Sequence, residues 1–230
     1  MTHSAAVAPL ARSRRPWVKI CGLRDPGQAA AIAAMGVDAI GVVAVPGSPR
    51  FVPLESRSLV FQAAREARSE VLGVLVTADP ADGDVSSLGT GHGHDVVQLH
   101  GGESVERCRQ LRRQLGAGVA LWKALRIRGT DDLRLCQAYG EVVDAVLLDA
   151  WVPHQLGGTG HAIPLDWLQD FTPSLPWWLA GGLTPENVGE ALKRSRPDGV
   201  DLSSGVEERP GWKDLERVEQ LVEAVAASRI

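Results

Sequence analysis

The sequence predicts an α/β protein built as a single (β/α)8 TIM barrel with a shortened or irregular third helix. Strand-like and helix-like segments alternate along the chain, and eight such pairs fit into 230 residues. That length suits one α/β barrel, since such domains commonly run to about 200–250 residues. The strand-like segments are apolar throughout, which is typical of a parallel sheet covered on both faces. Eight such units closed into a ring form the barrel.

The eight expected strands are short apolar segments, at 17–21, 38–45, 71–77, 95–99, 119–125, 143–149, 177–180 and 199–202. Seven clear helices are expected between or after them, at 26–35, 54–68, 103–115, 130–138, 164–170, 185–194 and 213–226. The first helix has the strongest start signal, because Asp25 can act as its N-cap and Pro26 occupies its first position.

The third helix is the weak place in this pattern. Its segment contains Pro80 and glycines at positions 83, 89, 91 and 93, which leaves 84–88 for a helical turn or two. Nearby, His92-Gly93-His94-Asp95 superficially resembles a metal-binding cluster. It lacks the four-ligand pattern of a structural metal site, so we expect a solvated loop there and no bound metal.

Composition and charge narrow the class of protein. The formal net charge is −4, which argues against a nucleic-acid binder, because such a protein normally shows a concentrated basic face. No apolar stretch approaches the ~20 residues of a membrane helix, and the first fifteen residues lack the apolar core of a secretory signal. Cys21, Cys108 and Cys136 have neither disulfide nor zinc spacing. We expect a cytoplasmic protein, monomeric or homodimeric, with residues 1–15 as a disordered tail and 16–230 as the barrel domain.

Three glycine-rich loops follow the last three strands. Glycine has no Cβ, so backbone N–H groups can approach an anion closely, and the loops after strands seven and eight commonly hold phosphate in barrels. The alternative is that these glycines only form tight turns. That would explain any one of the loops, but it explains three loops at regular spacing less well than a shared anion site does. The expected phosphate-binding residues are Gly158, Thr159, Gly160, Gly181, Gly182, Ser203, Ser204 and Gly205.

Reactive side chains of a barrel lie at the C-terminal ends of its strands. Cys21 ends the first strand and Asp149 ends the sixth. These strands lie well apart around the ring, so the two side chains can flank a small substrate on opposite sides. A thiolate is a workable proton acceptor and a buried carboxylic acid a workable donor. The alternatives are a cysteine that is only a small buried hydrophobe and an aspartate that caps the following loop. Other polar residues expected at this face are Arg50, Gln98, His100, Lys123 and Arg126.

Seven short motifs, in order and at matching spacing over about residues 17–225, resemble those of the phosphoribosylanthranilate isomerase family. They are Lys19-Ile20-Cys21-Gly22-Leu23, Gly47-Ser48-Pro49-Arg50-Phe51-Val52, Val97-Gln98-Leu99-His100-Gly101, Leu147-Leu148-Asp149, Gly157-Gly158-Thr159-Gly160, Leu179-Ala180-Gly181-Gly182-Leu183 and Asp201-Leu202-Ser203-Ser204-Gly205-Val206-Glu207. The sequence departs from the family pattern at Trp212, where a smaller aliphatic residue is usual, and has Trp151 directly after the sixth strand and its aspartate.

The resemblance implies an Amadori rearrangement of a small phosphorylated substrate in tryptophan biosynthesis, with no metal or cofactor. It makes Asp149 the general acid that opens the ribose ring and Cys21 the general base that takes the C2′ proton. Arg50 resembles the arginine for the anthranilate carboxylate, although a surface charge is its alternative, and Gln98 and His100 are assigned to the substrate pocket. Two other functions stay open: another phosphate-binding barrel enzyme of tryptophan or histidine biosynthesis, and a non-catalytic binder of phosphorylated metabolites.

Overall fold

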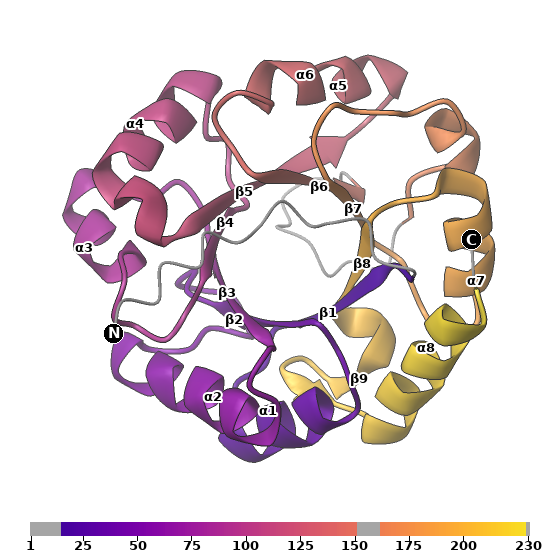
Figure 1. The fold of residues 1–230 in the computed structure, drawn as a ribbon, viewed down its shortest axis with the longest axis horizontal. Helices are drawn as coiled ribbons and strands as arrows, with labels where there is room; N and C mark the ends of the chain where they lie inside the picture. The colour runs from indigo at the N-terminus through magenta and orange to yellow at the C-terminus, as the bar shows by residue number, and fades with distance from the viewer. Residues whose placement is uncertain (1–14, 151–161, 229–230) are drawn as a thin grey trace.

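The strands form one closed barrel in which each pairs with its neighbours in chain order (Figure 1). The computed structural model describes residues 15–150 and 162–228. All eight barrel strands run parallel. They are β1 (Trp17–Cys21), β2 (Ala39–Val43), β3 (Leu72–Thr77), β4 (Val96–Leu99), β5 (Ala120–Ile127), β6 (Ala145–Ala150), β7 (Trp177–Ala180) and β8 (Gly199–Leu202). The predicted fold class is confirmed.

The helices form an outer ring around the barrel (Figure 1). The α-helices are α1 (Pro26–Ala34), α2 (Leu54–Ala67), α3 (Val85–Leu88), α4 (Val105–Leu115), α5 (Thr130–Arg134), α6 (Cys136–Tyr139), α7 (Val188–Ser195) and α8 (Leu215–Ala227). The described residues also form the 3-10 turns η1 (Asp82–Asp84), η2 (Gly116–Gly118), η3 (Leu165–Leu168) and η4 (Ser204–Val206). The segment predicted as one helix over 130–138 is split into α5 and α6, and 164–170 holds only η3. Asp25 caps α1 as expected, because its Oδ1 accepts a hydrogen bond from the N–H of Gln28 at 2.8 Å.

The third helix is short, as predicted, and two histidines bind its end. Nε2 of His94 lies 2.9 Å from the carbonyl oxygen of Leu88, and Nε2 of His92 lies 3.1 Å from that of Ser86. Burial lowers the pKa of His94, so its ring is neutral at pH 7. These imidazoles satisfy helix carbonyls, and within the described ranges no three potential metal-ligating side chains gather at one point.

Two apolar cores hold the barrel. Between strands and helices lies a continuous layer of mainly aliphatic side chains, while the apolar core inside the barrel consists of alanines, valines, a leucine and two tryptophans. The rings of Trp122 and Trp178 lie 4.9 Å apart, centre to centre. Gly199 makes room for them, because a Cβ there would lie 2.5 Å from the ring of Trp178. The barrel is therefore packed solid rather than open from end to end.

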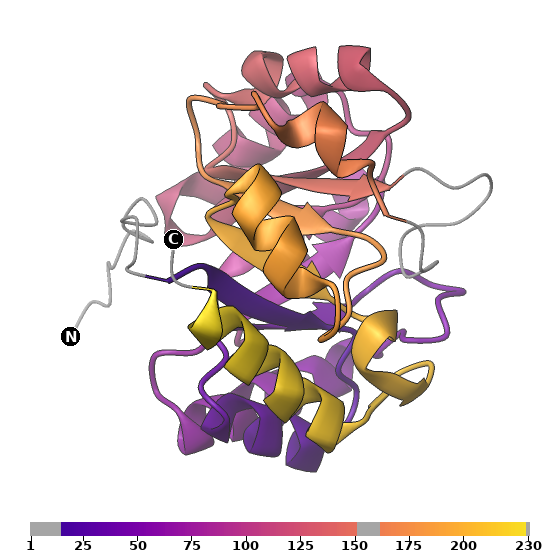
Figure 2. The same cartoon turned by 90° about the vertical axis from the view of Figure 1, so that its right-hand side faces the viewer.

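A small hairpin between β8 and α8 was not predicted. Its antiparallel strands are β9 (Glu207–Arg209) and β10 (Trp212–Lys213). Strands of two and three residues are too short to show an alternating pattern. In Figure 2 the hairpin lies at the end of the barrel toward which β1 points. It therefore adds Glu207 and Lys213 to the C-terminal face.

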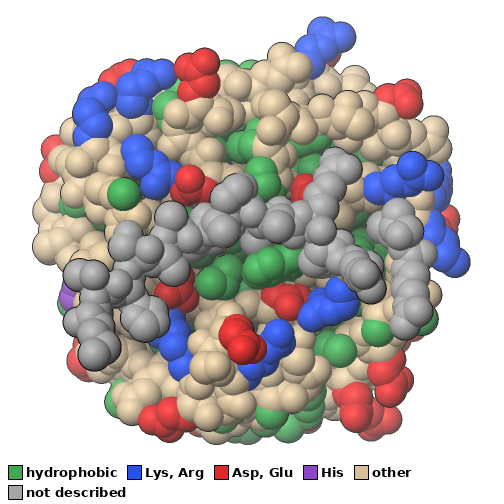
Figure 3. Space-filling model, viewed as in Figure 1, with side chains coloured by type: hydrophobic (Ala, Val, Ile, Leu, Met, Phe, Trp, Pro, Cys, Tyr) green, Lys and Arg blue, Asp and Glu red, His purple; other side chains and the backbone are tan. Residues whose placement is uncertain are grey.

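The opposite face, where the strands begin, is seen in Figure 3. Basic and acidic side chains alternate along the described part of its margin, so that part presents no continuous block of positive charge. Arg15, at the end of the predicted tail, is held by Asp38 through two hydrogen bonds of 2.7 and 2.8 Å. The preceding fourteen residues lie outside the described ones. Among the described helices none has the length and apolar character needed to cross a bilayer.

Candidate active site

Two reactive groups lie on either side of the loops that follow β7 and β8. Cys21 is the last residue of β1, and Asp149 is the last but one of β6. Around the closed ring, β7 and β8 stand between β6 and β1. A ligand bound at the ends of β7 and β8 would therefore have the Cys21 thiol on one side and the Asp149 carboxyl on the other.

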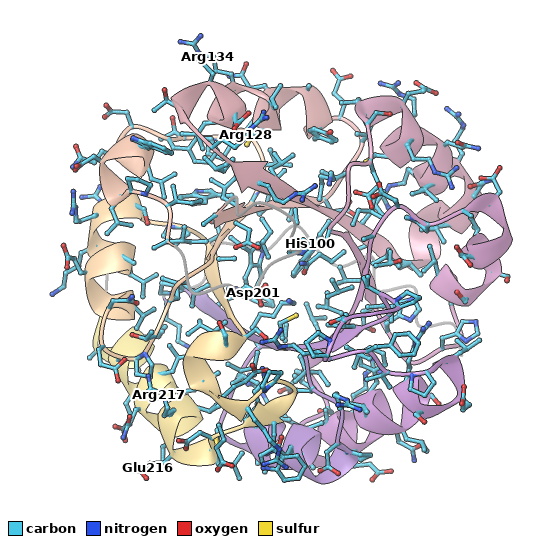
Figure 4. All side chains as sticks on the ribbon, turned by 180° about the vertical axis from the view of Figure 1, so that it is seen from behind. His100, Arg128, Arg134, Asp201, Glu216 and Arg217 are labelled. Atoms are coloured by element: carbon cyan, nitrogen blue, oxygen red, sulfur yellow. The ribbon has the colours of Figure 1, made fainter. Side chains whose placement is uncertain are left out.

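Asp149 is joined to two further predicted site residues. Its Oδ2 lies 3.2 Å from Nε2 of His100, and Nδ1 of His100 lies 3.1 Å from Nε2 of Gln98. The three side chains therefore form a chain of contacts from Gln98 through His100 to Asp149. Asp149 is 4% exposed and Gln98 is fully buried. Figure 4, which looks onto the ends of the strands, shows His100 over the centre of the barrel.

Lys19 and Asp201 are ionisable neighbours of Cys21 that the sequence analysis did not assign to the site. Lys19, fully buried inside the barrel, places its Nζ 2.8 Å from Oδ1 of Asp201. Burial raises the pKa of the Cys21 thiol, while the charge of Lys19 opposes that rise. A lysine within an otherwise apolar strand was the available signal, because lysine is almost never fully buried unless it is paired.

Arg50 is not a surface charge, so that alternative is wrong. Its Nε and Nη2 bind both carboxylate oxygens of Glu207, at 2.9 and 2.6 Å, and its side chain is only 13% exposed. Lys213 binds the same carboxylate at 2.6 Å. Burial opposes ionisation of Glu207, but its hydrogen bond from Arg50 and the charge of Lys213 outweigh this and lower its pKa. Glu207 and Lys213 were missed because the hairpin that carries them was missed.

The loops after β7 and β8 pack directly on each other. A Cβ on Gly205 would lie 1.9 Å from the carbonyl oxygen of Leu183, so only glycine fits there. Gly181 and Gly182 have φ of +82° and +64°, a conformation that favours glycine. The N–H groups of Gly182, Ser204 and Gly205 donate no hydrogen bond to another described residue. This arrangement suits an anion.

Ser203 and three residues that follow β6 were also predicted to bind phosphate. The Ser203 hydroxyl donates to the carbonyl oxygen of Cys21 at 3.0 Å, so it joins this loop to β1. Gly158, Thr159 and Gly160 lie outside the described residues, as does Trp151.

Lys123, also expected at this face, is bound entirely by the protein. Its Nζ contacts the Glu103 carboxylate at 2.8 Å and the carbonyl oxygens of Gly101 and Ala124 at 3.0 and 2.8 Å. Glu103 in turn accepts from the N–H of Asp79 at 2.7 Å. This buried pair fixes the loop that carries His100 and leaves Lys123 no free donor for a substrate.

The chain is similar in sequence to known proteins over most of its length. Residues 18–224 match the family described as N-(5'phosphoribosyl)anthranilate (PRA) isomerase. The chain is 49% identical over 207 residues to the N-(5'-phosphoribosyl)anthranilate isomerase of Synechocystis sp., covering 89% of this chain and 93% of that protein.

Two solved structures extend the comparison. The phosphoribosyl anthranilate isomerase of Thermotoga maritima has a TM-score of 0.81 at 28% identity, with 92% of this chain and 99% of that one covered. A phosphoribosyl anthranilate isomerase in complex with reduced 1-(o-carboxyphenylamino)-1-deoxyribulose 5-phosphate has a TM-score of 0.75 at 28% identity over the same shares. The chain belongs to the N-(5'-phosphoribosyl)anthranilate isomerase family.

Proposed function

We propose that this barrel catalyses the Amadori rearrangement of N-(5′-phosphoribosyl)anthranilate to 1-(2-carboxyphenylamino)-1-deoxyribulose 5-phosphate in tryptophan biosynthesis, with Cys21 and Asp149 as its acid–base pair. The observation that carries the assignment is the order around the ring. A phosphate at the ends of β7 and β8 places the attached ribose between the end of β1 and the end of β6. Both proton-transfer groups then face the sugar from opposite sides.

The phosphate site is proposed from backbone geometry. Gly181, Gly182, Ser204 and Gly205 offer N–H groups from two loops in contact, and the N–H of Ser203 belongs to the same turn. Gly158, Thr159 and Gly160 are proposed to complete it from the loop after β6. Backbone donors are suited to a phosphate because they need no charged partner of their own.

Ring opening is assigned to Asp149. As a carboxylic acid it donates its proton to the ribose ring oxygen, the C1′–O bond breaks, and the anilino nitrogen forms an iminium at C1′. His100, oriented by Gln98, holds the Asp149 side chain in place through the 3.2 Å contact. His100 and Gln98 thus belong to the substrate pocket as positioning groups.

Proton abstraction is assigned to Cys21. The thiolate takes the proton from C2′, and the electron pair of that bond moves to C1′ and neutralises the iminium nitrogen. The resulting enolamine tautomerises to the ketone. Because the iminium acidifies the C2′ proton, the route needs neither a metal nor a cofactor.

Arg50 is proposed to recognise the anthranilate carboxylate. Glu207 occupies Nε and Nη2, and Nη1 donates to no other described residue. A carboxylate approaching Nη1 meets a guanidinium whose position is already fixed, which lowers the entropy lost on binding. The proposal extends to a cytoplasmic enzyme that works as a monomer or within a homodimer.

The test is turnover of N-(5′-phosphoribosyl)anthranilate by the purified protein, followed by the loss of anthranilate fluorescence. We expect turnover with this substrate and none with an aminoaldose phosphate that lacks the anthranilate ring. If only the second substrate is turned over, the protein is better explained as another phosphate-binding barrel enzyme of tryptophan or histidine biosynthesis. Binding of both without turnover would favour a metabolite binder.

A further inference from the structure

A buried ammonium lies beside the proposed base. Lys19 and Cys21 are two residues apart on β1, so both side chains point into the barrel. Lys19 is fully buried, and Asp201, its register partner on β8, binds its Nζ at 2.8 Å. Figure 4 shows Asp201 close to the centre of the barrel mouth. An ammonium is costly to bury even when paired, so its presence here calls for a functional account.

Gly41 on β2 brings the ammonium and the thiol together. Gly41 is the register partner of Cys21. A Cβ placed on it would lie 2.8 Å from Sγ of Cys21 and 3.2 Å from Nζ of Lys19. The sulfur and the nitrogen therefore converge on the space that this glycine leaves open.

Charges from several elements face the thiol. Burial raises the pKa of Cys21, the Lys19 ammonium on β1 is the largest influence that lowers it, Asp201 on β8 raises it, and Lys213 on β10 lowers it. Arg50 and Glu207 lie beyond Lys213 as a bidentate pair. Lys19 is thus the cation that acts most on the sulfur, and Asp201 the anion that competes with the sulfur for that cation.

We propose that Lys19 is a positioning residue for proton abstraction, which stabilises the Cys21 thiolate with its ammonium while Asp201 fixes that ammonium in place. This rests on the proposed function of Cys21 as the base. The thiol first loses its proton to solvent, and the negative sulfur is compensated by Lys19. The thiolate then takes the C2′ proton, the S–H bond re-forms, and the electron pair of the C–H bond passes to the iminium.

A purely structural lysine would behave differently. If Lys19 served only to pair Asp201 inside the barrel, removing either partner would destabilise the fold and leave the thiol's reactivity unchanged. If Lys19 acts on the sulfur, the two removals have opposite effects. Lys19→Met takes away the compensating charge, whereas Asp201→Asn removes the competing negative charge but keeps an amide oxygen that can hold the ammonium in place.

The experiment measures the rate at which iodoacetamide alkylates Cys21 in the free protein, as a function of pH, with the modified cysteine identified by peptide mass. Cys108 and Cys136 are fully buried, whereas Cys21 is partly exposed, so Cys21 reacts first. An opposite charge beside an ionisable group typically shifts its pKa by about 1–3 units. We expect Lys19→Met to slow alkylation at pH 7 by about tenfold or more and Asp201→Asn to accelerate it.

Lys193→Met is the matched control, because Lys193 is exposed on α7, and it should alkylate like wild type. Thermal melting identifies variants that fail to fold. If Lys19→Met unfolds, Gly41→Ala replaces it, since its Cβ enters the space between nitrogen and sulfur and should also slow alkylation. Unchanged alkylation in a folded Lys19→Met protein, or the same direction of change in Lys19→Met and Asp201→Asn, overturns the proposal.

Failure of the proposed function looks different. A fully active Cys21→Ala protein would remove Cys21 as the base, whatever the alkylation rates show. If Cys21 is the base and Lys19 acts on it, the acidic limb of the pH profile of kcat/KM shifts to higher pH in Lys19→Met. The alkylation profile should shift by the same number of pH units.

Discussion

Nε2 of His100 lies 3.2 Å from Oδ2 of Asp149, and the other ring nitrogen of His100 is held by Gln98. In the proposed mechanism this contact fixes the direction of the Asp149 carboxyl, and Asp149 itself transfers the proton. The roles of His100 and Asp149 are therefore separable by substitution.

His100→Ala should lower kcat by about 10- to 100-fold, because a misplaced acid loses rate steeply with small displacements. The KM should change little. Gln98→Leu should act in the same direction but more weakly, since Gln98 reaches Asp149 only through the imidazole. Steady-state kinetics check both. A loss in His100→Ala as large as that in Asp149→Ala would instead make the histidine the proton donor.

Arg50→Ala should weaken binding of a product analogue that carries the ring carboxylate much more than binding of one that lacks it. Charge-assisted hydrogen bonds are worth about 1.5–3 kcal/mol. Arg50→Lys should also weaken binding, because an ammonium cannot reproduce the fixed fork that holds Glu207. Calorimetric titration gives both affinities. Arg24→Ala is the control, because the exposed Arg24 guanidinium donates to the carbonyl oxygen of Pro49 and has no proposed contact with the substrate. If Arg50→Ala keeps the wild-type preference, Arg50 does not recognise the carboxylate.

Gly205→Ala should raise the KM for the phosphorylated substrate at least about tenfold, because the new Cβ collides with backbone and separates the two anion-binding loops. Inhibition by inorganic phosphate should weaken in parallel. Gly83→Ala is the control, since a Cβ there meets no atom within 4 Å. An unchanged KM and phosphate inhibition in folded Gly205→Ala would place the phosphate elsewhere.

Lys123→Met should destabilise the protein by about 3–5 kcal/mol, because it leaves the Glu103 charge buried and unpaired. Adding Glu103→Gln should recover part of that loss. Urea unfolding measures both. Arg128, labelled in Figure 4, pairs with Asp132 while 63% exposed, and Arg128→Ala should cost far less stability than Lys123→Met because solvent screens an exposed pair. An equal cost for the two pairs would contradict the burial argument.

The sequence was sufficient for the barrel because its strands are continuous apolar segments. β1, β7 and β8 have the predicted bounds, and the other strands differ by a few residues at their ends. Cys21, Asp149, Gln98 and His100 could be placed at the C-terminal mouth since strand ends in a barrel all meet there.

The pairs that tune the site could not be predicted in the same way. Lys19 and Asp201 are 182 positions apart, and Arg50 and Glu207 are 157 apart. No local pattern links such residues, and the β9–β10 hairpin is too short for a periodic signal. The burial of the Arg50 side chain also depends on that hairpin. For this reason the sequence alone left open that Arg50 was a charge on the surface.

The most direct test of the account is the turnover of N-(5′-phosphoribosyl)anthranilate by Cys21→Ala and by Asp149→Ala, alongside the affinity of each variant for a product analogue. General acid–base groups usually contribute about 10²–10⁴ in rate. We predict that each substitution lowers kcat by at least ~10²-fold, while analogue affinity changes much less, because neither residue is the main anchor. Near wild-type turnover in either variant would contradict the assignment of Cys21 and Asp149 as base and acid.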